Sequence, residues 1–308
     1  YTYLFGPVPS RRFGRSLGID LVPFKTCSFD CAFCEVGRTT FSTGERAEYV
    51  PIDDVVAEFQ QWVASGGEAE VITLAGSGEP TLHSRFGELI DAIRSSCDTP
   101  IVLLTNSSLM HLPDVRTSAA KADIVKVSLS AWDEASFQRV NRPASGLAFD
   151  ALVSGLQQFR SVFSGRLWLE VFLLKGINDA PAGVARIAAL AEGIAPDSVQ
   201  LNTVVRPPAE PSAVSISREE LECLAPLFSP PAEIIARFQA AEGQAPASSV
   251  RASHVLAMLT RRPCTLEDIA GAFGLEKALA ESLVETLASE QSIRAITRPD
   301  GVYYGPSE

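Results

Sequence analysis

Short apolar runs alternate with amphipathic stretches between residues 17 and 203, and this alternation constrains the fold more than any other feature of the chain. The apolar runs have the length of strands, and the amphipathic stretches have the length of helices. Repeated strand–helix order predicts a parallel sheet with right-handed crossovers, which is an α/β fold. The predicted strands cover residues 17–22, 71–75, 101–105, 123–129, 167–174 and 199–203. The predicted helices cover residues 52–65, 85–96, 133–140, 148–162 and 179–192.

Polar residues recur on one face of several predicted strands. Lys126 and Ser128 alternate with valines, Glu170 opposes a row of aliphatic residues, and Gln200 and Asn202 oppose Val and Leu. Successive side chains of a strand point to opposite faces, so these polar residues share the face that the helices do not cover. Two interpretations stay open: a face lined to receive a ligand, or an ion pair between Lys126 and Glu170 that only stabilises the sheet.

Cys27, Cys31 and Cys34 are separated by three and then two residues on one short loop. Three thiolates in this pattern can bind three irons of a four-iron cluster, which leaves the fourth iron open to a small molecule. A disulfide framework would leave one sulfur over. A structural zinc site takes four ligands, commonly from two Cys-x-x-Cys pairs, and only one such pair is present. The spacing therefore favours a cluster over zinc, and zinc over cysteines that only pack.

The cysteine spacing, with Phe33 directly before the last cysteine, resembles that of the radical S-adenosylmethionine (radical SAM) superfamily. The sequence GSGEP at residues 76–80 follows an apolar run and resembles the glycine-rich segment of that superfamily. A narrower resemblance, to a group of bacterial and archaeal proteins related to the wyosine-forming tRNA enzymes, rests on four further segments. These are GPVPSRRFGRSLG at 6–18, VNRP at 140–143, LKGIND at 174–179 and LNTVVRPPAE at 201–210.

The resemblance implies a partial (β/α)6 TIM-type barrel over residues 1–210. It also implies two cofactors: a [4Fe-4S] cluster on the three cysteines, and S-adenosyl-L-methionine bound at the open iron. One electron from the reduced cluster would cleave S-adenosylmethionine to methionine and a 5′-deoxyadenosyl radical, which abstracts hydrogen from an unidentified substrate. The residues implied to contact S-adenosylmethionine are Gly76, Ser77, Gly78 and Glu79 at the methionyl end, Asn106, Ser128 or Glu170 at the ribose, and the backbone near Phe33 at the adenine.

The cysteine loop, the glycine-rich segment and two further polar residues each follow the carboxyl end of a different predicted strand. The cysteine loop follows the first predicted strand, residues 76–80 follow the second, Asn106 ends the third and Arg206 follows the sixth. In barrels of this kind, function gathers at the carboxyl ends of the strands. We therefore expect these segments to form one site on one rim.

A second, smaller unit is predicted after residue 210. Residues 211–250 read as a linker with helices, and residues 251–308 read as a winged-helix-like domain. Helix-starting capping boxes are expected at Ser217 and Thr265. The helix in the recognition position carries three glutamates and one lysine, whereas a helix that reads DNA places cations near phosphates. DNA is therefore not the expected partner, and the unit is expected either to contact a protein or to pack on its own chain.

The charge of the chain limits the classes of partner. A formal net charge of −11 opposes broad binding to a phosphate backbone. A local cationic excess near the amino terminus is either solvated surface, the first interpretation, or a contact for an anionic substrate or for a reductant such as flavodoxin or ferredoxin. The cations of this patch are Arg11, Arg12, Arg15, Lys25 and Arg38. No apolar stretch approaches the roughly 20 residues that cross a bilayer, and unpaired cysteines suit the cytoplasm.

The substrate stays open at this point. An RNA base, a peptide or protein, and a small molecule are all compatible with the sequence, and so is a non-catalytic iron–sulfur sensor or electron-transfer protein. Cys97, Cys223 and Cys264 are too dispersed for a second cluster of the kind that the wyosine enzymes use. This difference weakens the transfer of their tRNA activity to this chain.

Overall fold

The computed structural model describes residues 1–10, 13–236, 252–261, 263–298 and 301–307. Its main element is an eight-stranded sheet in the order β1-β2-β5-β6-β7-β8-β9-β10. All neighbours are parallel except β1 and β2, which are antiparallel. The strands are β1 (Leu4–Ser10), β2 (Gly14–Ile19), β5 (Val71–Leu74), β6 (Ile101–Leu104), β7 (Ile124–Ser128), β8 (Arg166–Leu173), β9 (Ser198–Thr203) and β10 (Glu233–Ile234).

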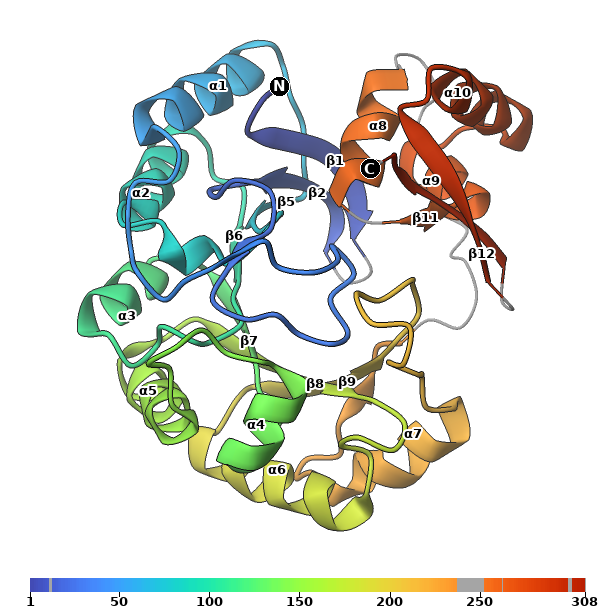
Figure 1. Ribbon diagram of the computed structural model, residues 1–308. Helices are drawn as coiled ribbons and strands as arrows, with labels where there is room; N and C mark the ends of the chain where they lie inside the picture. Colours follow the sequence, from blue (N-terminus) through green and yellow to red (C-terminus); the bar gives the residue numbers. More distant parts are fainter. Residues whose placement is uncertain (11–12, 237–251, 262, 299–300, 308) are drawn as a thin grey trace.

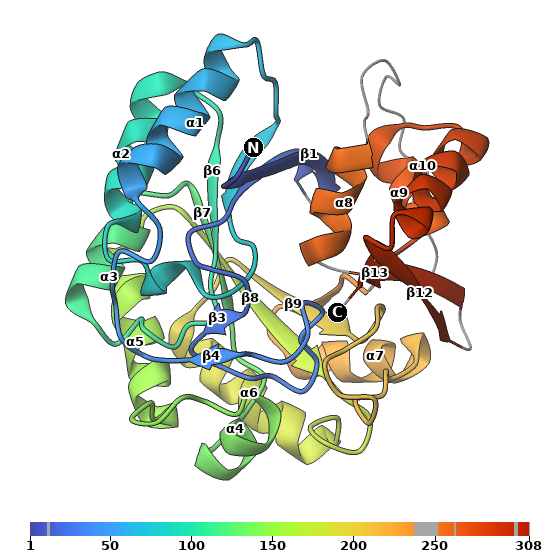
Figure 2. The same ribbon diagram turned by 45° about the horizontal axis from the view of Figure 1, so that its top comes forward.

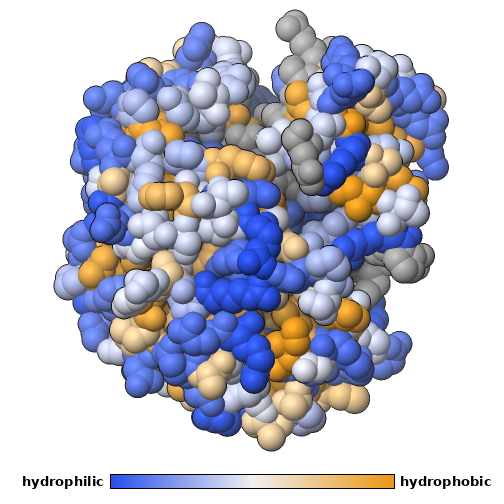
Figure 3. All heavy atoms as spheres, viewed as in Figure 1, coloured by the Kyte–Doolittle hydropathy of each residue, from blue (hydrophilic) through white to orange (hydrophobic). Residues whose placement is uncertain are grey.

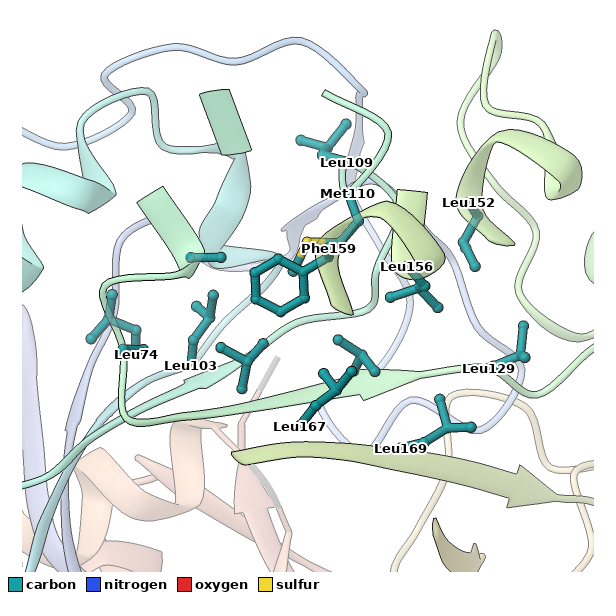
Figure 4. Packing of buried hydrophobic residues seen from close by; sticks show 14 of the residues in the cluster. Leu74, Leu103, Leu109, Met110, Leu129, Leu152, Leu156, Phe159, Leu167 and Leu169 are labelled. Carbon is teal, nitrogen blue, oxygen red and sulfur yellow. The ribbon is translucent and has the colours of Figure 1, made fainter. Parts of the chain in front are cut away.

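Helices cover one face of this sheet along its whole width (Figure 1). They are α1 (Ile52–Ala64), α2 (Phe86–Ser96), α3 (Pro113–Ala119), α4 (Glu134–Val140), α5 (Phe149–Val162) and α6 (Pro181–Ile194). Their apolar sides and the facing strand residues form one buried core, in which Phe159 and Leu156 of α5 pack toward Leu103, Leu167 and Leu169 (Figure 4). The predicted α/β fold class, with a mainly parallel sheet, is confirmed.

Two strands of the eight-stranded sheet, β1 and β10, and the helix α3 were absent from the predictions. The strand β1 contains Pro7 and Pro9, which lack the backbone N–H of a central strand, and it occupies the edge of the sheet. Its pairing with β2 shifts register between Phe5 and Val8, around the Gly6–Pro7 peptide. The strand β10 has two residues, too few to give a periodic signal. The helix α3 is no shorter than the predicted α4, but its sequence PDVRTSA contains a single large apolar residue, Val115.

The face of the sheet that the helices leave free has an apolar layer and a polar layer. In the apolar layer Phe13 stacks on Trp168 with ring centroids 5.0 Å apart, beside the buried residues of β5, β6 and β7. In the polar layer the Lys126 Nζ lies 2.5 Å from the Glu170 carboxylate, which also accepts a hydrogen bond from Asn202. The predicted alternation is confirmed, and the ion pair that it allowed does form.

The C-terminal part has a hydrophobic core of its own. It contains α8 (Ala252–Arg261), β11 (Cys264–Thr265), α9 (Leu266–Phe273), α10 (Lys277–Ser289), β12 (Ile293–Arg298) and β13 (Gly301–Pro306), with its sheet in the order β11-β13-β12. The capping boxes predicted at Ser217 and Thr265 are confirmed at the starts of α7 (Arg218–Leu224) and α9. The predicted linker 211–250 lies partly outside the described residues. None of the described helices is both long and apolar enough to cross a membrane.

This C-terminal module lies against β1 and the rim beyond β9 (Figures 1 and 2). Val8 of β1 packs on the module's core, and the Tyr303 hydroxyl donates to the Val205 carbonyl at 3.4 Å. The Arg206 guanidinium, with 8% of its side chain exposed, lies 3.2 Å from Glu35 and 3.7 Å from Asp268 of α9. A buried cation, Arg206, therefore connects the module to the loop that carries the cysteines.

We expect Arg206→Met to lower the free energy of unfolding by about 1–3 kcal/mol. Removing one partner of a fully buried ion pair costs about 3–5 kcal/mol, and the cost is smaller here because Glu35 and Asp268 stay partly hydrated. Chemical denaturation measures the change. The control is Arg218→Met, which breaks an exposed pair with Glu222 worth less than about 1 kcal/mol. Equal effects of the two substitutions would contradict the role of Arg206.

Candidate functional site

The loop that carries the cysteines is fixed on one side by the glycine-rich segment. The Lys25 N–H donates to the Ser77 carbonyl at 2.9 Å, and the Glu79 N–H donates to the Thr26 carbonyl at 3.3 Å. A Cβ on Gly78 would lie 1.7 Å from the Thr26 carbonyl oxygen, a distance that no side chain can occupy. Glycine at this position therefore lets the two loops lie in direct contact. The first and second predicted site segments meet as expected.

A second side of the loop is fixed by the chain that leaves α4. The Ala32 N–H donates to the Val140 carbonyl at 3.2 Å, and the Asp30 N–H donates to the Asn141 carbonyl at 3.1 Å. Phe29 and Pro143 form an isolated antiparallel bridge. The VNRP sequence at residues 140–143 thus acts as a clamp on the cysteine loop, a role that the sequence alone did not indicate.

The segment after β9 fixes a third side. The Ala209 N–H donates to the Cys34 carbonyl at 2.9 Å. The Glu210 carboxylate binds Arg38 and Arg142, and the hydrogen bond from Arg142 holds the pKa of Glu210 below its usual value. Hydrophilic side chains gather at the centre of the face on which the loops of residues 20–50 lie (Figure 3). The loop is therefore enclosed by segments that are far apart in the sequence.

Each of the three cysteines is half-buried, and two of their sulfurs accept a hydrogen bond from a side-chain amide. The Asn106 side-chain amide lies 3.5 Å from the Cys27 sulfur, and the Asn141 side-chain amide lies 3.5 Å from the Cys31 sulfur. The Gly37 N–H donates to the Cys34 carbonyl at 3.3 Å. Burial nevertheless raises the pKa of the Cys27 thiol to about 12, and it raises the pKa of Cys31 and Cys34 as well. Thiolates in this loop need a bound cation to be stable.

The arrangement of the cysteines fits a multi-iron group. In the described part of the chain, no three His, Cys, Asp or Glu side chains converge as ligands of one metal ion. Cysteines that each bind a different iron of one cluster do not have to converge on one point. A thiolate donor set, with amide N–H groups directed at the sulfurs, is the chemistry that iron–sulfur clusters require.

Asp20 is a site residue that the sequence analysis missed. Its carboxylate accepts a hydrogen bond from the Ser77 N–H at 3.0 Å and another from the Ser77 hydroxyl. Gly76 has a φ of +155°, and a Cβ there would lie 2.5 Å from the Asp20 carboxyl carbon. The Asp20 carboxylate thus fixes the glycine-rich segment through its hydrogen bonds with Ser77. An acidic residue inside an otherwise apolar predicted strand, next to the rim, was the signal for it.

Glu79 is buried, and two neighbouring rim segments donate to it. One carboxylate oxygen accepts hydrogen bonds from the Thr81 N–H, the Thr81 hydroxyl and the Thr105 hydroxyl, at 3.0, 2.6 and 2.7 Å. The other oxygen accepts from the Asn106 N–H at 2.7 Å. Burial raises the pKa of Glu79, and the hydrogen bonds from Thr105 and Thr81 oppose that rise. The carboxylate is fixed between the glycine-rich segment and the end of β6.

The comparison with protein families agrees with this geometry. The family described as the Radical SAM superfamily matches residues 21–186, which include all three cysteines and the glycine-rich segment. This chain belongs to the radical SAM superfamily. The cofactors of the superfamily, a [4Fe-4S] cluster and S-adenosylmethionine, are the two predicted from the sequence, and that prediction is confirmed.

Several curated relatives share most of the chain. The UPF0026 protein of Helicobacter pylori strain J99 is 32% identical over 268 residues, which cover 86% of each chain. A protein of Brachyspira hyodysenteriae named GTPase Obg is 34% identical over 293 residues, 94% of this chain but 43% of its own length. The UPF0026 protein of Methanocaldococcus jannaschii is 35% identical over 68% of this chain and 65% of its own length. The chain thus spans less than two thirds of these last two proteins.

Two solved structures share the fold at low sequence identity. A radical SAM methyltransferase from Sphaerobacter thermophilus superposes with a TM-score of 0.53 at 19% identity, over 72% of this chain and 65% of its own. SuiB of Streptococcus suis bound to S-adenosylmethionine also gives 0.53, at 12% identity over 71% of this chain and 50% of its own. These likenesses concern the fold.

The remaining predicted contact residues lie further along the same sheet. Phe33 stacks on Phe172 of β8, with ring centroids 4.1 Å apart. Ser128 and Glu170 are register partners on β7 and β8. Asn106 lies beside the cysteine loop, since its amide also donates to Ser28, and the hydroxyl of its neighbour Ser107 donates to the Ser128 carbonyl at 3.0 Å. The structure therefore places Asn106 between the cysteine loop and the end of β7, and the individual roles of the predicted residues stay predictions.

We expect Glu79→Gln to weaken S-adenosylmethionine binding by about 10- to 100-fold, because a hydrogen bond to a charged group is worth about 1.5–3 kcal/mol. Glutamine keeps one oxygen for Thr81 and Thr105 but carries no charge for the methionyl ammonium. Equilibrium binding to the anaerobically reconstituted protein measures the change. The control is Thr105→Val, which removes one donor and keeps the charge. Unchanged affinity in Glu79→Gln, at normal iron content, would exclude Glu79 as the ammonium partner.

Proposed function

We propose that this chain reductively cleaves S-adenosylmethionine at a [4Fe-4S] cluster and uses the resulting 5′-deoxyadenosyl radical to abstract hydrogen from a substrate. The observation that carries the proposal is the direct backbone contact between the cysteine loop and the glycine-rich segment. A cofactor bound by one of these segments would lie beside a cofactor bound by the other. In this superfamily the cluster supplies the electron, and the protein must orient the cofactors and exclude water.

The residues of the chain have separate tasks in this proposal. Cys27, Cys31 and Cys34 hold three irons and leave the fourth free. The backbone at Gly76 and Gly78 contacts the methionyl end of S-adenosylmethionine, because no Cβ stands in the way. Glu79 and Asp20 fix that segment, and Glu79 also offers a carboxylate to the ammonium. The irons are then oriented by backbone contacts from three separate segments rather than by the loop alone.

Ser128, Asn106 or Glu170 is proposed as the ribose contact, and the backbone near Phe33 is proposed to contact the adenine. Support comes from position: Ser128 ends β7, and Phe33 stacks against the carboxyl half of β8. Glu170 has a competing partner in Lys126, so a ribose hydroxyl would bind a carboxylate that is already charge-paired. We interpret the open sheet with its outer helices as the partial TIM-type barrel that the resemblance implies.

The C-terminal module is proposed to be winged-helix-like. Its helices and its antiparallel sheet in the order β11-β13-β12 support this, together with the two-strand ribbon of β12 and β13. The acidic character of α10 favours a protein or peptide partner over DNA. Under this proposal the module presents or selects the substrate at the rim to which Arg206 ties it.

A peptide or protein substrate and an RNA substrate both have support. Two curated relatives are named probable dual-specificity RNA methyltransferases RlmN, at 23% and 26% identity, and one is named a probable GTP 3′,8-cyclase. The cationic patch near the amino terminus gives RNA binding little support, because two of its cations are already paired with acidic side chains. Arg15 pairs with Glu68, and Arg38 pairs with Asp30. Arg11 and Arg12 lie outside the described residues. The net charge of −11 also opposes RNA. A wyosine-type activity rests on the sequence resemblance.

The reaction needs an external electron donor such as flavodoxin or ferredoxin, and the proposed location is the cytoplasm, where such carriers and reduced thiols occur. A non-catalytic alternative keeps the cluster for sensing or electron transfer. The catalytic proposal and this alternative can be distinguished without the substrate, because S-adenosylmethionine cleavage can be measured by itself.

The full chain, reconstituted anaerobically and reduced with dithionite, should convert S-adenosylmethionine to 5′-deoxyadenosine and methionine, as measured by chromatography. Cys31→Ala should give no product, because one iron loses its ligand. Cys97→Ala should give the wild-type amount, since Cys97 caps α2 away from the loop. A wild-type protein that holds its cluster and binds S-adenosylmethionine but forms no 5′-deoxyadenosine would favour the sensor or electron-transfer alternative.

A further inference from the structure

We propose that the side-chain amide of Asn141 raises the reduction potential of the cluster by donating a hydrogen bond to Cys31. The proposal rests on the proposed function in one respect, namely that the three cysteines hold a [4Fe-4S] cluster. It makes Asn141 a positioning and tuning residue that acts through Cys31. The residue belongs to the VNRP sequence, which otherwise contacts the cysteine loop through its backbone and pairs with Glu210 through Arg142.

The position of Asn141 is fixed through its backbone. It is the C-cap of α4, and its N–H donates to the Phe137 carbonyl at 2.9 Å. Its own carbonyl accepts the Asp30 N–H of the cysteine loop at 3.1 Å. With 6% of the residue exposed, the side chain points inward, and its amide nitrogen lies 3.5 Å from the Cys31 sulfur. The donor is held by the helix, not by the loop that it serves.

Cys31 and Cys27 each accept a hydrogen bond from a side-chain amide, that of Asn141 and that of Asn106, with nitrogen–sulfur distances of 3.5 Å. Asn106 also donates to Ser28 through its amide and to Glu79 through its backbone, so its replacement would disturb other contacts of the site. The donor to Cys31 can be replaced while every backbone hydrogen bond of the clamp is kept.

The direction of the effect follows from electrostatics. Reduction adds one electron from the external donor to the cluster and adds no proton, so negative charge on the sulfur ligands increases. A hydrogen bond to a charged acceptor is stronger than one to a neutral acceptor, so the amide stabilises the reduced cluster more than the oxidised cluster. Hydrogen bonds to the sulfurs and burial are among the factors that set cluster potentials. Both act here on Cys31.

The test is an anaerobic potentiometric titration of the full reconstituted chain with dithionite, followed by electron paramagnetic resonance of the reduced cluster. Asn141→Leu removes the donor without adding charge and should shift the midpoint potential to a more negative value. Asn141→Asp replaces the amide donor with an acceptor and should shift the midpoint further in the same direction. The matched control is Gln138→Glu, which makes the same chemical change on the exposed face of α4 and should leave the midpoint unchanged.

Each outcome bears on the proposal. Midpoints of both variants equal to wild type would overturn it, and so would a shift of equal size in the control. Loss of iron from both variants at an unchanged unfolding midpoint would also overturn it, because the amide would then serve to hold the loop rather than to adjust the potential. A wild-type protein without a [4Fe-4S] spectrum would instead refute the proposed function, which separates the two failures.

Discussion

The burial of three thiols in one loop is the constraint on which the rest of the structure depends. Burial raises the pKa of Cys27, Cys31 and Cys34, so the loop cannot stabilise three thiolates by solvation. Bound irons would supply the compensating charge. The backbone contacts from the glycine-rich segment, the chain after α4 and the chain after β9 fix the loop that carries the cysteines.

Buried carboxylates connect the segments of the rim to one another. The Glu79 carboxylate joins the glycine-rich segment to the end of β6, and Asp20 joins it to the end of β2. Arg206 extends the connection to Asp268 in the C-terminal module. A substrate bound by that module would be linked to the cluster loop through a buried guanidinium. Large displacement of the module would expose a charge that is now 8% exposed and paired.

Much of the fold could be predicted from the sequence because the strand–helix alternation is strong between residues 17 and 203. The strand β1 was not predicted because proline is unfavourable in strands, although an edge strand tolerates it. The three cysteines and residues 76–80 were found from local spacing. Asp20 and Asn141 were missed as site residues because their roles depend on contacts between segments 57 and 110 positions apart. Local patterns carry no information on such contacts.

The central claim is that one iron of the cluster has no protein ligand and is free to bind S-adenosylmethionine. Mössbauer spectroscopy of anaerobically reconstituted, iron-57-labelled protein, recorded with and without S-adenosylmethionine, tests it directly. A free iron predicts that one iron in four changes its spectrum when S-adenosylmethionine is added, while the other three do not. Four irons unaffected by saturating S-adenosylmethionine, as in a cubane with a fourth side-chain ligand, or a protein that holds one zinc ion instead, would contradict the claim.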